Sequence, residues 1–264
     1  KIKLYVSLNK RKNKPILLKE VFGANLNDLK IVGLDLSSVE LNGLDISNSE
    51  FINVQFNGAV ITQVNMKNVK FDSCDFTNAT LANVDLSSTS FTNSVIKNCK
   101  LENVDLNYSK FFDTNFTRTT VIDSSFIGTD LKQDHIEETK FENVDFSKSN
   151  LSYLLAQKSS FHNCKFVGAD MNKSKLKSCS FISSNFTEAN FENADLQYAN
   201  LDRTNFNFSN LHNCIMRNAK LNEANLSNAY AYKADFQGAV LTGAKLDGAD
   251  MRGANLENTM LVKK

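Results

Sequence analysis

A five-residue period runs through nearly the whole chain. Stepping by five from Leu26 to Leu256 visits 47 positions without an insertion or deletion, and every one of them holds an apolar residue. Only 42% of the chain is apolar, so a run of this length does not arise by chance. We call these positions the centres of the repeats. This internal repetition constrains the fold more than any other feature of the sequence.

The period excludes an α-helix and restricts how a strand can be used. Five residues advance a helix by roughly 140°, so the centres would spiral around it without forming one face. In a strand, residues two apart share a face, and an odd period would send successive centres to opposite faces. The chain must therefore turn once per repeat to keep every centre inside. Turning in one sense closes it into an all-β solenoid, a parallel β-helix.

A period of twenty residues aligns the phenylalanines best. It places five of them in one column: Phe126, Phe146, Phe166, Phe186 and Phe206. A period of fifteen from Phe126 meets Phe141, Ala156 and Met171 instead. We therefore expect four repeats per coil, four walls and about twelve coils. Asparagines also recur in outward columns and are expected to bond along the axis, as in the set Asn83, Asn103, Asn143 and Asn163.

A second column, two residues before each centre, holds Ala, Val, Ser, Thr or Cys in 42 of the 47 repeats. All five cysteines belong to it: Cys74, Cys99, Cys164, Cys179 and Cys214. Their number is odd and no CxxC spacing occurs, so we expect reduced thiols that fill small core positions. The three histidines, His135, His162 and His212, are scattered along the chain. No metal or other cofactor is therefore predicted.

Several repeats resemble the A(D/N)LXX signature of the pentapeptide-repeat family. The signature is clear from Ala194 to Tyr198 and from Ala254 to Asn258, and the resemblance covers residues 24–258. It implies a right-handed, four-sided parallel β-helix, in agreement with four repeats per coil. It implies very little about function, because one fold can carry many different sites.

The two ends of the chain lie outside the period. Apolar and polar residues alternate from Ile2 to Leu8 before a basic turn, which predicts that residues 1–23 form a hairpin capping the first coil. A basic arm that binds nucleic acid is the alternative. Residues 259–264 form a short tail with little room for a cap. An end-to-end homodimer or a covalently attached downstream domain is expected to cover the strand edges of the last coil.

Charge is unevenly distributed along the chain. Residues 1–20 carry seven Lys and Arg against one Glu, and the remaining residues sum to −5 from 23 basic and 28 acidic side chains. Such a mixed surface is neither a stripe for nucleic acid nor a polyanion, so we expect no direct nucleic-acid binding. The sequence has no run of about 18 apolar residues and predicts no transmembrane segment. The unpaired cysteines indicate a reducing compartment, the bacterial cytoplasm or a host cytosol.

No pattern in the sequence indicates catalysis. There is no GxSxG or phosphate-binding glycine motif, and no histidine is spaced to activate a serine or cysteine. The strongest acidic set forms one column at intervals of twenty residues: Asp45, Asn65, Asp85, Asp105, Ser125 and Asp145. Stacked carboxylates could hold a cation, but Asp and Asn that stabilise turns are the favoured interpretation. We therefore expect no enzyme activity.

The small-residue column is interrupted near residue 134. Asp134 places a charge in it, and one coil later Leu154 places a bulky residue there, while the centre that follows is only Ala156. One interpretation is a local bulge or an exchange of side chains without further role. The other is a surface for a protein partner, with Tyr153 and Leu155 pointing outward. The candidate contact patch comprises Asp134, His135, Tyr153, Leu154 and Leu155.

These features favour a non-enzymatic protein–protein interaction scaffold. One setting for it is the β-helix module of a larger secreted bacterial effector, which this chain resembles. The alternative is a DNA mimic that protects a topoisomerase (gyrase), as in the quinolone-resistance branch of the family. That branch relies on a strongly acidic rod, whereas this chain has bases at Lys158, Lys165, Lys173, Lys175 and Lys177. A third alternative is binding to a membrane surface through the basic N-terminal turn.

Overall fold

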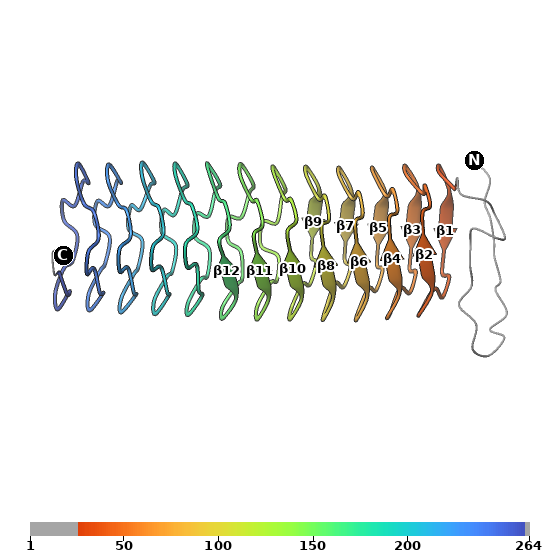
Figure 1. Ribbon diagram of the computed structural model, residues 1–264, viewed down its shortest axis with the longest axis horizontal. Coiled ribbons are helices and arrows are strands. Elements are labelled where there is room, and N and C mark those ends of the chain that lie inside the picture. Colours follow the sequence, from red (N-terminus) through yellow and green to blue (C-terminus); the bar gives the residue numbers. More distant parts are fainter. Residues whose placement is uncertain (1–25, 262–264) are drawn as a thin grey trace.

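The computed structural model describes residues 26–261. This part of the chain winds into a long rod of stacked coils, and it contains strands and turns but no helix (Figure 1). The prediction of an all-β solenoid is confirmed. The predicted hairpin of residues 1–23 lies outside the described residues.

The strands form two parallel sheets. The first contains β1 (Lys30–Val32), β3 (Glu50–Ile52), β5 (Lys70–Asp72), β7 (Ser90–Thr92) and β9 (Lys110–Phe112). The second contains β2 (Glu40–Asn42), β4 (Val60–Thr62), β6 (Thr80–Ala82), β8 (Lys100–Glu102), β10 (Thr120–Ile122), β11 (Lys140–Glu142) and β12 (Ser160–His162). Neighbouring strands are offset by twenty residues, as Ile31 is from Phe51. One coil is therefore four repeats, as the sequence predicted.

Single-residue parallel bridges continue the same pairing beyond the regular strands. They run from Asp35 with Gln55 to Val240 with Met260, and each joins residues twenty apart. The longer ladder of regular strands has seven members, fewer than the dozen coils expected from the sequence. Past β12, the coils are held by these bridges and by backbone hydrogen bonds. The amide of Lys175, for example, donates to the carbonyl of Leu154 at 2.8 Å.

Four walls surround the core, and we name them by their centres, which follow at intervals of twenty residues. Wall A contains the centres from Ile31 to Met251, wall B those from Leu36 to Leu256, wall C those from Leu41 to Leu261, and wall D those from Leu26 to Leu246. The centre of each repeat points inward, and the residues on either side of it point outward. In β2 only the centre is buried.

Stacked phenylalanine rings fill much of the core. On wall D the rings of Phe146 and Phe166 lie 5.1 Å apart and 6° from parallel, and Phe186 continues the stack at 4.9 Å. Between walls the rings meet edge to face, as Phe146 and Phe161 do at 71°. Both arrangements are favourable for aromatic pairs, and all four rings are buried. Because the core is packed continuously, other molecules can contact only the walls and ends of the rod.

Each corner depends on a left-handed residue two positions after the centre. The φ angle is 56° at Asn83, 58° at Tyr153 and 56° at Lys173. An Asp or Asn just before many of the centres fixes the turn by accepting the N–H two residues further on, as Asp85 Oδ1 does from Ser87 at 2.8 Å. The corners thus set which side chains face outward on each wall.

Candidate partner-binding surface

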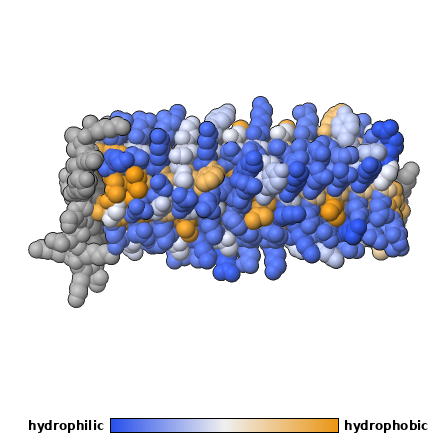
Figure 2. Space-filling view, turned by 180° about the vertical axis from the view of Figure 1, so that it is seen from behind, coloured by the Kyte–Doolittle hydropathy of each residue, from blue (hydrophilic) through white to orange (hydrophobic). Residues whose placement is uncertain are grey.

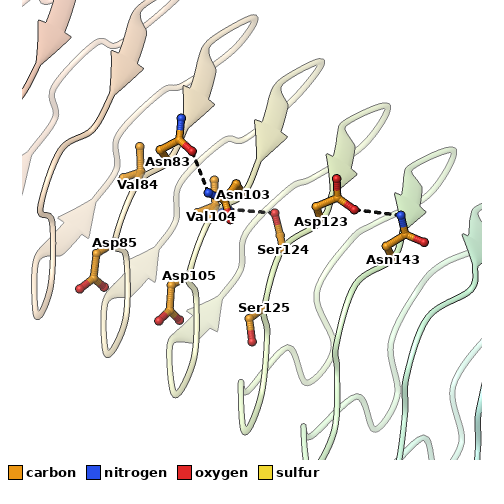
Figure 3. A pocket seen from close by; sticks show the side chains of 10 residues that line it. All are labelled: Asn83, Val84, Asp85, Asn103, Val104, Asp105, Asp123, Ser124, Ser125 and Asn143. Atoms are coloured by element: carbon orange, nitrogen blue, oxygen red, sulfur yellow. Dashed lines mark hydrogen bonds between the residues drawn. The ribbon is translucent and has the colours of Figure 1, made fainter.

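Three members of the predicted acidic column, Asp85, Asp105 and Ser125, line a shallow groove of about 600 Å³ between walls C and D (Figure 3). The carboxylates of the column accept hydrogen bonds from the backbone. The Oδ1 atoms of Asp85 and Asp105 each accept an N–H two residues on at 2.8 Å, and those of Asp45 and Asp145 do so at 3.0 and 2.9 Å. The hydrogen bonds from Ser47 hold the pKa of Asp45 below its usual value. These bonds confirm that the column stabilises turns.

Amide side chains bond along the axis on the other side of this groove. Asn103 Nδ2 donates to Asn83 Oδ1 at 2.7 Å, and Asn143 Nδ2 donates to Asp123 Oδ1 at 2.8 Å (Figure 3). Asn163 extends the second series to Asn143 at 2.7 Å. The predicted asparagine ladder is confirmed. Within residues 26–261, no group of three or more His, Cys, Asp or Glu side chains is arranged to hold a metal ion.

All five cysteines are buried and unpaired, as predicted. Burial raises the pKa of the Cys99, Cys164 and Cys179 thiols to about 12 and that of Cys74 to about 11. The thiol of Cys99 donates to the carbonyl of Phe76 at 2.9 Å. A buried thiol that stays protonated is a poor nucleophile and a poor metal ligand. These side chains therefore serve packing.

The structure corrects two members of the predicted contact patch. Asp134 and Leu154 have exposed fractions of 0% and 1%, so neither can touch a partner. Of the two local explanations, a bulge or an exchange of side chains, the bulge is absent here, because Leu155 pairs in register with His135 on one side and Lys175 on the other. A bulky Leu154 beside a small Ala156, both buried, keeps the core filled without displacing the backbone.

Asp134 is a charged group enclosed in the core. Its Oδ1 accepts the amide N–H of Thr114 at 2.7 Å, while its Oδ2 has no hydrogen-bond partner. Burial raises the pKa of Asp134 to about 7, and the carboxylates of Asp130 and Asp113 add to the rise. The backbone accommodates the carboxyl instead of turning it outward, because an adjacent coil supplies an N–H at the right place.

Tyr153 is exposed at the corner between walls A and B. Its ring lies between two ammonium groups, that of Lys132 at 5.8 Å and that of Lys173 at 5.3 Å from the ring centroid. Lys173 Nζ also donates to Tyr153 Oη at 3.1 Å. Beside it, Leu155 is half-buried and His135 Nδ1 lies 3.3 Å from Glu137 Oε1. These contacts favour this orientation of the ring on the surface.

A row of lysines crosses wall B in the next coil. Lys173, Lys175 and Lys177 are alternate residues around the buried centre Leu176, and all three are exposed. Lys177 Nζ lies 5.4 Å from the centroid of the Tyr198 ring one coil further on. Sequence reasoning noted these lysines only as evidence against an acidic rod. Their spacing of two residues about a centre is the signal that places them in one row, from Lys173 at the corner to Lys175 and Lys177 on wall B.

We call this surface the Tyr153 patch. It consists of His135, Tyr153, Leu155, Lys158, Lys173, Lys175, Lys177 and Tyr198. The two buried side-chain atoms of the described chain that have no hydrogen-bond partner, Asp134 Oδ2 and Gln157 Oε1, belong to the same coils. Such atoms are uncommon in folded proteins.

Outside this patch the most exposed aromatic side chains are Phe112 at 70% and Tyr108 at 66%. Figure 2 shows one face of the rod as mostly hydrophilic, with apolar groups gathered at the end beside the grey residues and scattered singly elsewhere. A second shallow groove of about 530 Å³ lies over Tyr230 and Tyr232, where His212 stacks on Tyr232 at 5.2 Å. Among the described residues no helix has the length and apolarity needed to cross a membrane.

Comparisons with solved structures return proteins of low identity. HetL, a pentapeptide-repeat protein involved in heterocyst differentiation regulation in the cyanobacterium Nostoc, is 18% identical over 92% of this chain and 94% of its own, with a TM-score of 0.32. QnrB1, a plasmid-mediated fluoroquinolone resistance protein, is 16% identical over 83% of this chain and 92% of its own, with a TM-score of 0.45. Likenesses this weak carry no argument about function. No curated protein sequence matches the chain.

Family models give the clear result. The model described as a pentapeptide repeat region matches residues 34–111 and 156–230, and the model described as pentapeptide repeats matches residues 219–258 in eight copies. Together they cover more than half of the sequence, and the matched residues lie in the coils described above. The chain therefore belongs to the pentapeptide-repeat family.

Proposed function

We propose that this protein is a non-enzymatic scaffold that binds a protein partner through the Tyr153 patch. The observation that carries the proposal is the exposure of Tyr153 at 38% and Tyr198 at 54% amid lysines on a wall with no protruding loop. Tyrosine combines a large apolar ring with a hydroxyl, and it is enriched among the residues that dominate binding energy at protein interfaces.

The rod supports this role by holding the patch rigid. The side chain of Tyr153 contacts two lysines and accepts one hydrogen bond, and the backbone beside it pairs with the coils on both sides. A side chain that is already ordered before binding loses less conformational entropy when the partner arrives. A stiff wall with fixed aromatic anchors therefore suits recognition better than catalysis, which needs an enclosed pocket with converging polar groups.

The proposal includes a cytosolic location and the absence of enzyme activity. Five unpaired cysteines suit a reducing compartment, and their burial keeps them out of redox chemistry. The grooves on the rod are shallow, and the carboxylates of the acidic column are occupied by backbone N–H groups. A rod that mimics DNA would need carboxylates where wall B has a row of lysines.

The test is partner capture by an immobilised protein with and without the patch. The variant Tyr153→Ala with Leu155→Ser removes the aromatic anchor and its apolar neighbour. A matched control, Tyr230→Ala with Val60→Ser, removes a tyrosine exposed at 57% and an aliphatic residue exposed at 42% from walls A and C. Partners recovered with the wild type are identified by mass spectrometry and measured again in purified form.

We expect the patch variant to lose the partner while it keeps the circular dichroism spectrum and melting temperature of the wild type. The control is expected to retain the partner. Retention by the patch variant, or equal loss by the control, would contradict the proposal.

A further inference from the structure

We infer that the partner is recognised through an acidic segment that lies across wall B on Lys173, Lys175 and Lys177; the inference rests on the function proposed above. None of the ammonium groups of Lys132, Lys158, Lys173, Lys175 and Lys177 forms a close ion pair in the part of the chain that the structure describes, although Lys158, after Arg118, also lowers the pKa of Glu138. These five exposed cations leave a local positive charge on a rod whose residues 21–264 sum to −5. A partner of opposite charge is the complement.

The spacing of the row fits an extended peptide. Side chains two apart in extended backbone lie roughly 7 Å from each other on the same face. Lys175 forms the parallel bridge of wall B, and Lys173 and Lys177, two residues to either side of it, lie in the turns at the two ends of the wall. Lys173 is held against Tyr153 at its corner. A partner segment in extended conformation presents carboxylates at alternate positions, which can face Lys175 and its two neighbours.

Flanking acidic residues limit how far an anionic ligand can extend along the rod. Asp195 follows Lys175 in the same outward column, one coil further on. In the opposite direction, Glu137 and Glu138 belong to the coil of His135, and Glu138 is paired with Arg118 at 2.8 Å. The positive area therefore spans about two coils. A long polyanion such as nucleic acid would run onto carboxylates at both edges, whereas a short acidic peptide would not.

Apolar side chains lie beside the lysine row and at its two ends, and they indicate a second feature of the ligand. Leu155 pairs with Lys175 on the neighbouring coil, and Tyr153 and Tyr198 lie at the two corners of wall B. A partner segment that places an aromatic residue at one end of its carboxylates would contact one of these rings. The ligand is thus a protein segment with acidic residues at alternate positions and an aromatic residue at an end.

The direct test is fluorescence anisotropy with a labelled eight-residue peptide that alternates Glu with Ala and ends in Phe. Titration uses the full chain, its triple variant Lys173→Glu, Lys175→Glu and Lys177→Glu, and a control triple variant, Lys67→Glu, Lys70→Glu and Lys110→Glu. The control lysines are also exposed and without ion pairs in the described chain, but they lie in other coils.

We expect the peptide to bind the wild type and the control within about twofold of each other, and the wall B variant at least about tenfold more weakly. A peptide with Lys in place of Glu should reverse this order and prefer the wall B variant. Equal binding by all three proteins would overturn the inference. So would tighter binding of a single-stranded oligonucleotide or of phosphatidylserine vesicles at equal salt, because the ligand class would then be wrong.

The two proposals fail in distinguishable ways. If the Tyr153→Ala, Leu155→Ser variant loses its captured partner while the wall B lysine variant keeps both partner and peptide, the scaffold function stands and the acidic segment is wrong. If the first variant keeps its partner, the scaffold proposal is wrong at this surface whatever the peptide does.

Discussion

At the scale of single residues, Asp134 shows how a stacked fold can absorb a charged side chain. In the small-residue column, serine commonly accepts the amide N–H one coil earlier and donates to a nearby carbonyl. Ser184, for example, accepts from Cys164 at 3.1 Å and donates to Phe161 at 2.7 Å. Asp134 makes the first bond with Thr114, but its second oxygen has no partner. The hydrogen-bonding groups around this position therefore match a hydroxyl, but the residue there carries a carboxyl.

The variant Asp134→Ser should be more stable than the wild type, and more so at high pH. The pKa of Asp134 is raised from 3.8 to about 7, so the folded protein holds a proton that the unfolded chain releases as pH rises from about 4 to 7. The contribution of Asp134 to the free energy of unfolding is fully present below about pH 4, falls between about pH 4 and pH 7, and is constant above about pH 7. The serine variant should gain up to about 4 kcal/mol at pH 8, and much less at pH 4.

Urea unfolding of both proteins at several pH values measures this difference. Comparing variant with wild type cancels the other carboxyl groups, such as Asp45, whose pKa is lowered and which act in the opposite direction. A stability difference that does not grow between pH 4 and pH 8 would show that Asp134 titrates normally.

At the scale of the repeat, the left-handed corner is the most demanding local feature. This conformation costs a residue with a side chain roughly 1–2 kcal/mol, and yet most of the described corners are formed by such a residue. Glu188 has a φ of 60° in the same corner column as Gly168, whose φ is 64°. A Cβ atom added at Gly168 would meet nothing within 4 Å. Space is available at this corner, and the cost lies in the backbone.

The variant Glu188→Gly should therefore raise the free energy of unfolding by about 0.5–1 kcal/mol. Glycine removes the backbone cost of the left-handed conformation, and this gain exceeds the loss from its greater freedom in the unfolded chain. Glu188→Ala is the control, because alanine has the same backbone cost in this conformation and should not raise the free energy of unfolding. Chemical denaturation of the three proteins decides the matter. An equal gain from alanine would point to the charge of Glu188 rather than its backbone.

The sequence predicts the repeat well because each repeat meets the same surroundings. The centres, the buried cysteines and the ladder from Asn83 to Asn103 all follow from spacing, since a period of twenty brings like residues into contact. Contacts within one irregular coil do not follow from spacing. Whether Asp134 stays inside depends on an N–H from Thr114, and the importance of Lys175 depends on which acids lie near it in three dimensions.

At the scale of the whole molecule, stiffness and charge decide what the rod can imitate or bind. The phenylalanine stacks and the pairing between coils make one continuous core, so the walls keep a fixed spacing along the axis. On that frame the charges are mixed, with 23 basic and 28 acidic residues after residue 20. DNA presents one negative charge for about every 1.7 Å of its axis. This rod lacks such a continuous series.

The purified protein should therefore neither inhibit DNA supercoiling by gyrase nor rescue gyrase from a quinolone at micromolar concentration. The row of Lys173, Lys175 and Lys177 would meet the basic DNA-binding surface of the enzyme with like charge. The triple Lys→Glu variant of this row changes the net charge of residues 21–264 from −5 to −11, since each substitution removes two positive units. This variant tests whether net charge alone prevents the rod from mimicking DNA. We expect no protection from either protein, because carboxylates on one coil do not reproduce the even spacing of phosphates along a duplex. Salt-sensitive protection by the wild type in a supercoiling assay would contradict this prediction and favour the DNA-mimic function over the scaffold.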